Sequence, residues 1–392
     1  MSPLRLPRSW VRIGALVVAA CLVAAIAAAL AGGGRPAGRR TDTAASRGGA
    51  AGPAPLTPLQ LAGQRIVYSY RGLRPPASLL ARIRSGEAAG VVFFSDNVSS
   101  MAQLSSVVRE LDAANASPAN PVRLPLLLMT DQEGGIVRRL PGAPAESEEQ
   151  VGQSARPAAG AATAGAGAAR TLRAAGLNVN LAPVLDVSGY SGDFIDVFGR
   201  SYGTTAGAVG PLGAEFIAAQ QRAGVAATGK HFPGLGEAAR RQDTDERPVT
   251  LPESLTAIRD VGEQPFRRAI RAHVALIMLS WAVYPSLAPG RPAGLSSRIV
   301  QGELRDRLGF GGVTVSDALE AGALRQFGGF GHRAELAAQA GLDLILCSHG
   351  SVAEGSQAVQ GLAAGYRDGS LSHAAFSAAL HRVQRLRASL SG

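Results

Sequence analysis

Cysteine is almost missing from this chain of 392 residues, which contains only Cys21 and Cys347. Cys21 lies in an apolar N-terminal segment, whereas Cys347 ends an apolar run near the other end of the sequence. Two cysteines placed in this way argue against a structural disulfide, and they are too few for a cysteine-ligated metal site.

Lysine is scarcer still, because Lys230 is the only one and all the other long basic side chains are arginines. A lone lysine suggests a site that needs a compact ammonium group on a flexible stem rather than a planar guanidinium. Chance survival in an arginine-rich composition is the alternative. Lys230 directly follows a small apolar run at 225–228 and opens a Pro/Gly turn. Parallel α/β scaffolds present polar sites in this way, at the carboxyl ends of their strands.

Charged residues make up only 17% of the chain and hydrophobic residues 46%, as in a globular protein. Much of the net charge of +10 comes from seven arginines before residue 48. The chain has no basic patch interleaved with aromatic residues, no zinc-ligand spacing and no basic helix. We therefore expect no nucleic-acid partner.

The N-terminal segment reads as an export signal. Three arginines at positions 5, 8 and 12 precede an uncharged apolar run at 13–31, which is long enough to span a bilayer once. Residues 1–31 are therefore predicted to be a signal peptide or a membrane anchor, with the protein body outside the cytoplasm. Val18-Ala19-Ala20-Cys21 also resembles a lipobox, so a lipoprotein attached through Cys21 is an alternative, although the residues after Cys21 stay apolar.

Residues 32–55 are rich in Gly, Ala, Pro and Arg and read as a flexible linker. Beyond it, eight apolar runs alternate with helical patterns. The candidate strands are residues 66–69, 90–94, 124–130, 179–182, 225–228, 275–279, 312–316 and 342–346. The candidate helices include residues 99–115, 157–175, 205–223, 255–272, 297–308, 333–340, 352–364 and 373–390. This alternation predicts an α/β protein with one catalytic domain, a (β/α)8 TIM barrel over residues 56–392. A doubly wound sheet is the alternative, but no glycine-rich fingerprint follows the first strand.

Polar residues follow the third to the eighth candidate strand. They are Asp131, Glu133, Arg139, Asp186, Arg200, Lys230, His231, Ser280, Asp317, Ser348 and His349. Because the carboxyl ends of barrel strands meet on one face, these residues predict an active site there.

Six of these segments resemble motifs of family 3 glycoside hydrolases, and they occur in that family's order. They are Gly90-Val91-Val92-Phe93-Phe94 with Asn97, Asp131-Gln132-Glu133-Gly134-Gly135, Asn180-Leu181-Ala182-Pro183-Val184-Leu185-Asp186, Arg200-Ser201-Tyr202-Gly203, Lys230-His231-Phe232-Pro233-Gly234 and Val315-Ser316-Asp317-Ala318-Leu319. The chain is most similar to the single-domain bacterial β-N-acetylhexosaminidases of that family, from about residue 56 to its C-terminus.

The resemblance implies that Asp317 is the nucleophile of a retaining mechanism, in which a glycosyl-enzyme intermediate forms. A cap of the following helix is the alternative role for this aspartate. The resemblance also implies that Glu133 and Asp186 brace loops. No metal and no organic cofactor are implied. The positions that match sugar-binding residues are Asp131, Arg139, Arg200, Lys230 and His231.

The chain departs from the family in the loop that supplies the general acid/base. In the hexosaminidases this loop carries Gly-His-Gly and then Asp-Ser-His, whose last histidine transfers the proton. Here Leu235 replaces the first histidine, and Asp243-Thr244-Asp245 replaces the second group. Asp245, or its neighbour Asp243, can serve as the acid only if burial or nearby carboxylates raise its pKa. A solvated acidic loop without catalytic function is the alternative.

Three hypotheses follow from the resemblance. The first is an exported β-N-acetylglucosaminidase that acts as a monomer on peptidoglycan or chitin fragments. The second is another family 3 activity, such as a β-glucosidase or a phosphorylase. The third is a catalytically weak sugar-binding protein that has lost the acid/base.

Overall fold

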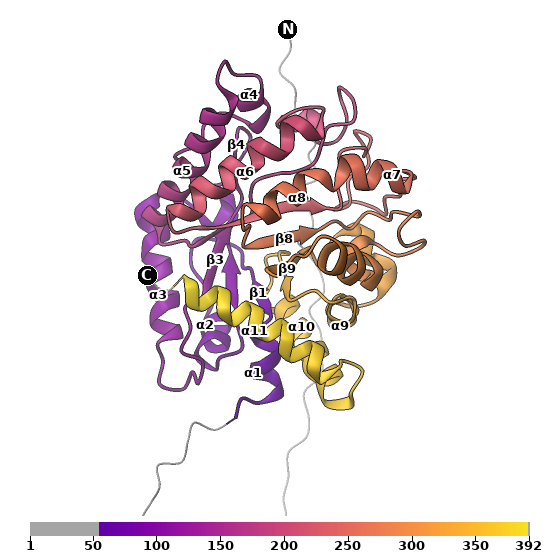
Figure 1. Cartoon of the computed structure of the whole chain (residues 1–392). Helices are drawn as coiled ribbons and strands as arrows, with labels where there is room; N and C mark the ends of the chain where they lie inside the picture. Colours follow the sequence, from indigo (N-terminus) through magenta and orange to yellow (C-terminus); the bar gives the residue numbers. More distant parts are fainter. Residues whose placement is uncertain (1–54, 391–392) are drawn as a thin grey trace, which may run out of the picture. The chain divides into compact units, whose positions relative to one another are not determined.

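The computed structural model describes residues 55–390. Eight parallel strands close into a barrel in the order β1-β10-β9-β8-β7-β6-β3-β2 (Figure 1). The strands are β1 (Ile66–Tyr68), β2 (Gly90–Val92), β3 (Leu127–Thr130), β6 (Val179–Asn180), β7 (Ala226–Phe232), β8 (Leu276–Leu279), β9 (Val313–Ala318) and β10 (Leu344–Leu346). Each lies within or overlaps one of the eight predicted strands, so the predicted TIM barrel is confirmed.

Helices surround the barrel and connect successive strands. The ring contains α2 (Ala77–Arg84), α3 (Met101–Asn115), α5 (Pro157–Ala175), α6 (Ala206–Arg222), α8 (Gln264–Arg271), the π-helical segment η6 (Arg298–Arg307), α9 (Phe330–Ala340) and α10 (Val352–Asp368). The elements that were not among the named candidates include α2 and also α1 (Pro58–Gly63), α4 (Glu148–Gly152) and the antiparallel hairpin of β4 (Gln132–Gly134) and β5 (Val137–Arg138). The last four are too short to show a hydrophobic period.

The single helix predicted at 255–272 is wrong in one respect, because the structure divides this segment. α7 (Leu255–Ala257) runs into the π-helical turn η4 (Ile258–Gly262), and α8 begins after Glu263. Pro265 occupies the first turn of α8, where its missing N–H costs nothing, whereas inside a continuous helix it would remove a hydrogen bond.

Side chains alternate between the two faces of the barrel wall. Val67, Leu127, Val315 and Leu344 belong to the apolar cluster inside the barrel. Their neighbours along the strands, such as Ile66, Leu128 and Ile345, belong to the larger cluster that packs against the helices. This period of two is expected for strands whose two faces are both covered by apolar groups.

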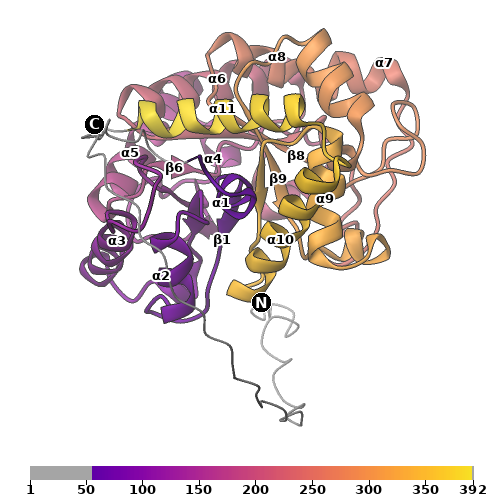
Figure 2. The same cartoon turned by 90° about the horizontal axis from the view of Figure 1, so that it is seen from below.

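The last helix, α11 (His373–Ser389), closes the amino end of the barrel (Figure 2). Its Val383 and Leu386 join the interior cluster. Arg382 pairs with Asp343 just before β10, and Arg387 donates to the carbonyl of Pro125 shortly before β3. The barrel is therefore filled and covered at this end, which leaves the opposite face for a site.

The predicted leader at 1–31 and nearly all of the predicted linker lie outside the described residues, so these predictions stay predictions. Within residues 55–390, no helix is both long and apolar enough to cross a membrane.

Candidate active site

The predicted site residues come together at the carboxyl ends of the strands. Asp131 follows β3, Lys230 and His231 lie in β7, and Asp317 lies in β9. The prediction that a strand ends at residue 228 is wrong, since β7 continues to Phe232. Backbone pairing with β8 extends past Gly229 to Phe232 through an irregular register, and this pairing does not depend on how polar the side chains are.

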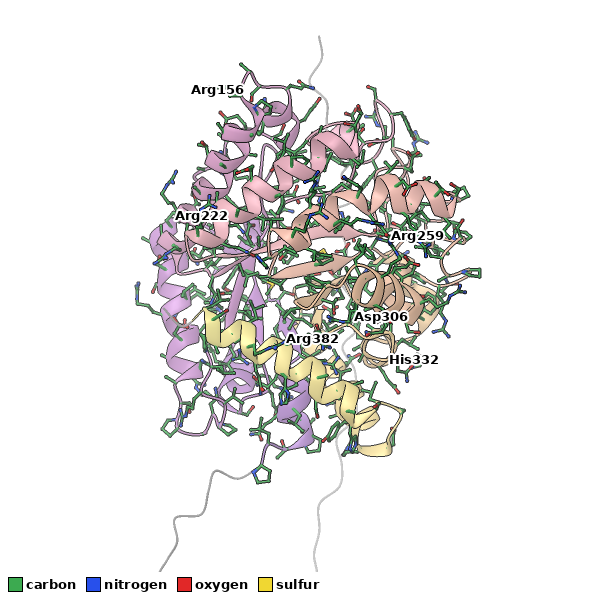
Figure 3. The ribbon with its side chains drawn as sticks, viewed as in Figure 1. Arg156, Arg222, Arg259, Asp306, His332 and Arg382 are labelled. Carbon is green, nitrogen blue, oxygen red and sulfur yellow. The ribbon has the colours of Figure 1, made fainter. Side chains whose placement is uncertain are left out.

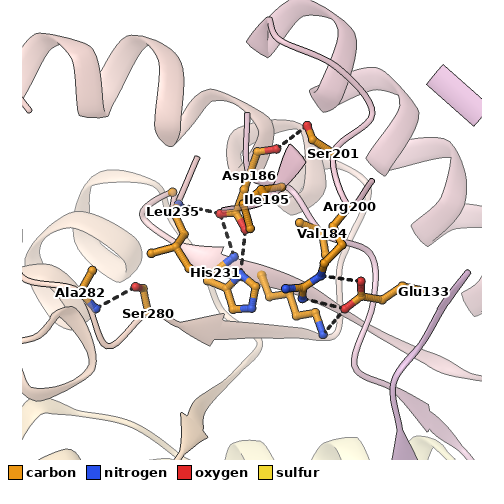
Figure 4. Close-up of polar contacts among 12 residues, drawn as sticks. Glu133, Val184, Asp186, Ile195, Arg200, Ser201, His231, Leu235, Ser280 and Ala282 are labelled. Atoms are coloured by element: carbon orange, nitrogen blue, oxygen red, sulfur yellow. Dashed lines mark hydrogen bonds and ion pairs between the residues drawn. The ribbon is translucent and has the colours of Figure 1, made fainter. Parts of the chain in front are cut away.

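Lys230 is buried between two carboxylates. Its Nζ lies 2.7 Å from Asp131 Oδ1 and 2.7 Å from Glu133 Oε1, and 3% of its side chain is exposed. Arg200 donates two hydrogen bonds of 2.9 Å to the same Glu133 carboxylate (Figure 4). Glu133 thereby joins the two cations across the site.

These contacts hold both ions charged. Burial alone would raise the pKa of Glu133, but Arg200 and Lys230 outweigh it and lower the pKa to about 2. Burial likewise works to lower the pKa of Lys230, but Asp131 and Glu133 raise it. Fixed cations beside carboxylates offer strong, directional hydrogen bonds to hydroxyl groups. Arg139, the fifth residue predicted to bind sugar, is half-buried, and its Nε lies 4.0 Å from Asp131 Oδ2.

Asp186 fixes His231. Asp186 is fully buried, and its Oδ1 accepts backbone N–H groups from His231 at 3.2 Å and Leu235 at 2.7 Å. Its Oδ2 lies 2.7 Å from His231 Nδ1 (Figure 4). A carboxylate can only accept, so Nδ1 carries the hydrogen and Nε2 is left with a lone pair or a second proton. These contacts agree with the prediction that Asp186 braces a loop. Asp186 also holds the ring of His231, which is one of the predicted site residues.

Asp317 is half-buried near the end of β9, where its Oδ1 accepts the Ala318 N–H at 2.7 Å. The loop after β7 lies against the segment that follows this strand. Gly322 N–H donates to the Asp245 carbonyl at 2.7 Å, and Ala323 N–H donates to the Thr244 carbonyl at 3.0 Å. The structure therefore places the acidic loop against the segment that directly follows Asp317.

The surroundings of the two loop aspartates favour their protonated forms. Burial raises the pKa of Asp243, and the negative charges of Glu246 and Asp317 raise it further. Asp245 keeps contact with solvent, yet the protein around it and the charges of Asp317, Asp243 and Glu320 raise its pKa well above the usual range.

Sequence reasoning missed three further acidic residues near the site. Glu320 lies three residues after Asp317 and accepts hydrogen bonds from the Ser348 hydroxyl at 3.0 and 3.2 Å. Burial and the charge of Glu320 raise the pKa of Glu354 to about 9. Glu148 lies buried behind Glu133. The spacing from Asp317 could have pointed to Glu320, but no sequence signal marks the other two.

Other features of the described residues lie apart from this site. Two shallow surface depressions, one along α11 and one between α5 and α6, contain none of the predicted site residues. Figure 3 shows Arg156, Arg222, Arg259 and His332 on the outside of the helical ring. Within the described part of the chain, no group of three or more His, Cys, Asp or Glu could hold a metal ion.

The geometry agrees with the family that the motifs suggested. A family model, the glycosyl hydrolase family 3 N terminal domain, matches residues 64–386. The chain belongs to glycoside hydrolase family 3. It is therefore a glycoside hydrolase, with β-hexosaminidases among its relatives.

Relatives of known sequence support this membership. A protein of the fungus Arthroderma benhamiae, named an uncharacterized secreted glycosyl hydrolase, is 45% identical over 331 residues, which cover 84% of this chain and 93% of the relative. A β-hexosaminidase of Thioalkalivibrio sulfidiphilus is 38% identical over 277 residues, which cover 67% of this chain and 74% of the relative.

Solved structures of two bacterial relatives share the barrel. A family 3 β-N-acetylglucosaminidase from Paenibacillus superposes with a TM-score of 0.80 at 35% identity, covering 86% of this chain and 63% of the longer one. A β-N-acetylhexosaminidase from Beutenbergia cavernae superposes with a TM-score of 0.75 at 31% identity, covering 85% of this chain and 99% of the other.

Proposed function

We propose that this protein is an exported, retaining β-glycosidase that removes terminal β-N-acetylglucosamine from peptidoglycan or chitin fragments. The observation that carries the proposal is the contact of the Asp243–Asp245 loop with the segment that follows Asp317, at the same end of the barrel as Lys230. The β-hexosaminidases and the β-N-acetylglucosaminidase among its relatives support N-acetylglucosamine as the sugar that is removed. The predicted leader, together with a relative that is named as secreted, supports export.

In the proposed mechanism, the Asp317 carboxylate attacks the anomeric carbon and forms a glycosyl ester. As the bond to the leaving oxygen breaks, the acid in the loop donates its proton to that oxygen. Water then attacks the same anomeric carbon while the loop carboxylate takes a proton from it, and the bond from that carbon to Asp317 breaks, so the sugar leaves and the Asp317 carboxylate is freed. Asp131, Arg139, Arg200, Lys230 and His231 bind the sugar hydroxyls.

Asp245 suits the acid role better than Asp243. The Asp243 carboxylate already accepts the Asp245 N–H at 2.9 Å, a bond that favours its ionised form. Among the described residues, nothing donates a hydrogen bond to the Asp245 carboxylate, and three negative charges favour its protonated form. A carboxyl group kept neutral in this way can release its proton to a leaving oxygen.

The test compares the full chain with Asp317→Asn, Asp245→Asn and Asp243→Asn. Each is assayed on 4-methylumbelliferyl β-N-acetylglucosaminide, on the matching β-glucoside, and on chitobiose, whose leaving group needs acid help. We expect Asp317→Asn to lose more than about 1,000-fold of kcat on every substrate that the wild type cleaves. Asp245→Asn is expected to lose about 100- to 10,000-fold in glycosidic bond cleavage on chitobiose, but far less on the aryl substrate.

Each part of the proposal has its own contradicting result. Cleavage of the glucoside alone would reject the sugar, and full activity of Asp317→Asn would reject the nucleophile. A greater loss on chitobiose for Asp243→Asn than for Asp245→Asn would transfer the acid role to Asp243. Sugar binding without turnover of any substrate would identify a binding protein.

A further inference from the structure

The short helix α4 contacts the loop that carries Arg200. The Glu149 N–H donates to the Gly199 carbonyl at 3.2 Å, directly before Arg200. On the other side of this arginine, Gly152 lies so close to Tyr202 that a Cβ atom at Gly152 would be 2.0 Å from the Tyr202 carbonyl oxygen. The helix α4 therefore contacts the backbone on both sides of Arg200.

Glu148, in the same helix, contacts the segment after β6 that pairs with the backbone of the second cation, Lys230. Glu148 Oε1 accepts the Val184 N–H at 2.9 Å, and only 2% of the Glu148 surface is exposed. Val184 forms a parallel bridge with Lys230, and the Leu185 N–H donates to the Lys230 carbonyl at 2.7 Å. Glu148 thus links α4 to the backbone beside Lys230.

The second oxygen of Glu148 is buried and, within residues 55–390, has no hydrogen-bond partner. The charged groups that face this carboxyl are Glu133 from β4, Arg200 from its loop and Lys230 from β7. The buried hydroxyl of Tyr202 also lies close enough for Glu148 and Glu133 to affect it. Burial raises the pKa of Glu148 well above its usual range, and the charge of Glu133 adds to the effect.

Two buried carboxyl groups side by side cannot both be ionised at low cost. Glu133 keeps its charge, since Arg200 and Lys230 pair with it directly. This arrangement favours the protonated form of Glu148 over that of Glu133. An ionised Glu148 would repel Glu133 and compete with it for the same two cations.

We propose that Glu148 is a positioning residue that, as a neutral acid, keeps Arg200 and Lys230 on Glu133 in the geometry that binds the sugar. The proposal rests on the proposed function, because it takes the Lys230 group to be the sugar site. Glu148 itself is buried and acts through the two cations. The sugar site should consequently loosen when Glu148 loses its proton.

The test uses the full chain with Glu148→Gln, Glu148→Ala and, as a control in the same helix, Glu149→Gln. KM and kcat for 4-methylumbelliferyl β-N-acetylglucosaminide are measured from pH 5 to pH 10. We expect Glu148→Ala to raise KM about tenfold at neutral pH, as the loss of one buried hydrogen bond would. Glutamine, which is neutral and keeps the carbonyl oxygen, should stay within about twofold of the wild type.

The pH profile separates positioning from a purely structural role. Wild type and Glu149→Gln should show KM rising on the alkaline side, and this rise should be reduced in Glu148→Gln. Three results would overturn the proposal: an unchanged alkaline rise in Glu148→Gln, equal damage by glutamine and alanine, or wild-type KM in Glu148→Ala.

A readout without turnover keeps this test independent of the proposed function. A raised pKa in the folded state means that the folded protein binds more protons, so stability falls as pH rises from the usual glutamate range towards the raised pKa. The melting temperature of the wild type should therefore fall more steeply than that of Glu148→Gln, and equal slopes would reject the neutral acid. If the wild type cleaves nothing, calorimetric binding of N-acetylglucosamine replaces KM. Absence of both turnover and binding would refute the proposed function. The melting curves would still test whether Glu148 is protonated in the folded protein.

Discussion

Asp186 determines what His231 can do, because its buried carboxylate orients the ring and the backbone at once. The sequence placed Asp186 on the catalytic face, and the family resemblance implied only that it braces a loop. Asp186 and His231 are 45 positions apart in the sequence. No local sequence pattern predicts a contact between residues so far apart. In contrast, Lys230 and Asp317 stood out from the sequence through their motifs.

Replacement of Asp186 by asparagine should lower kcat/KM about 10- to 100-fold, by analogy with the loss seen when the carboxylate that orients a metal-bound histidine is removed. The amide is neutral and only its oxygen accepts hydrogen bonds, so it cannot bind the ring N–H and both backbone N–H groups as the carboxylate does. His231→Ala and the double variant complete a mutant cycle. If His231 acts through its bond to Asp186, the losses will be far from additive. Additive losses would show that the two residues work separately.

At the scale of elements, the position of the acidic loop depends on a glycine in another loop. A Cβ atom at Gly322 would lie 2.1 Å from the Glu246 carbonyl oxygen, so no larger residue fits without moving the backbone. Gly322 also donates its N–H to the Asp245 carbonyl. The loop after β7 and the loop after β9 are therefore placed as a pair.

Gly322→Ala should displace the Asp243–Asp245 loop and lower kcat/KM for chitobiose about 10- to 100-fold, as small misplacements of catalytic groups do. Gly329→Ala is the matched control, because nothing lies within 4 Å of its added Cβ atom. The aryl substrate should be affected much less, since its leaving group needs little acid help. Equal kinetics of Gly322→Ala and wild type would remove the support for a loop acid.

The elements differ in how well sequence patterns predicted them. Apolar runs located all eight barrel strands, and the long helix α5 begins and ends at the predicted residues. The helix α4, which contains Glu148, was missed because a helix of five residues shows no hydrophobic period. Its position behind Lys230 depends on packing between segments distant in sequence.

At the scale of the whole molecule, residues 1–31 are predicted to export a barrel that needs no leader to fold. Deletion of these residues should leave the protein in the cytoplasm of a bacterial host with kcat/KM unchanged within about twofold, because the matched barrel begins at residue 64. Cell fractionation with immunoblotting measures this, and sedimentation should show a monomer.

Cys21→Ser distinguishes a lipid anchor from an ordinary leader. A variant released from the membrane would indicate lipid attachment, whereas unchanged fractionation would indicate a signal peptide or a transmembrane anchor. Export of the shortened chain would contradict the predicted leader altogether.

The sequence by itself determined the barrel, the face that carries the site and the family, because apolar periodicity and short motifs are local properties of the chain. The tertiary structure decided which charges meet. It placed Glu133 between Arg200 and Lys230, paired Asp186 with His231, and set Glu148 behind them. The raised pKa values of Asp245 and Glu148 also depend on the tertiary structure, since desolvation and neighbouring charge arise only when distant segments are folded together.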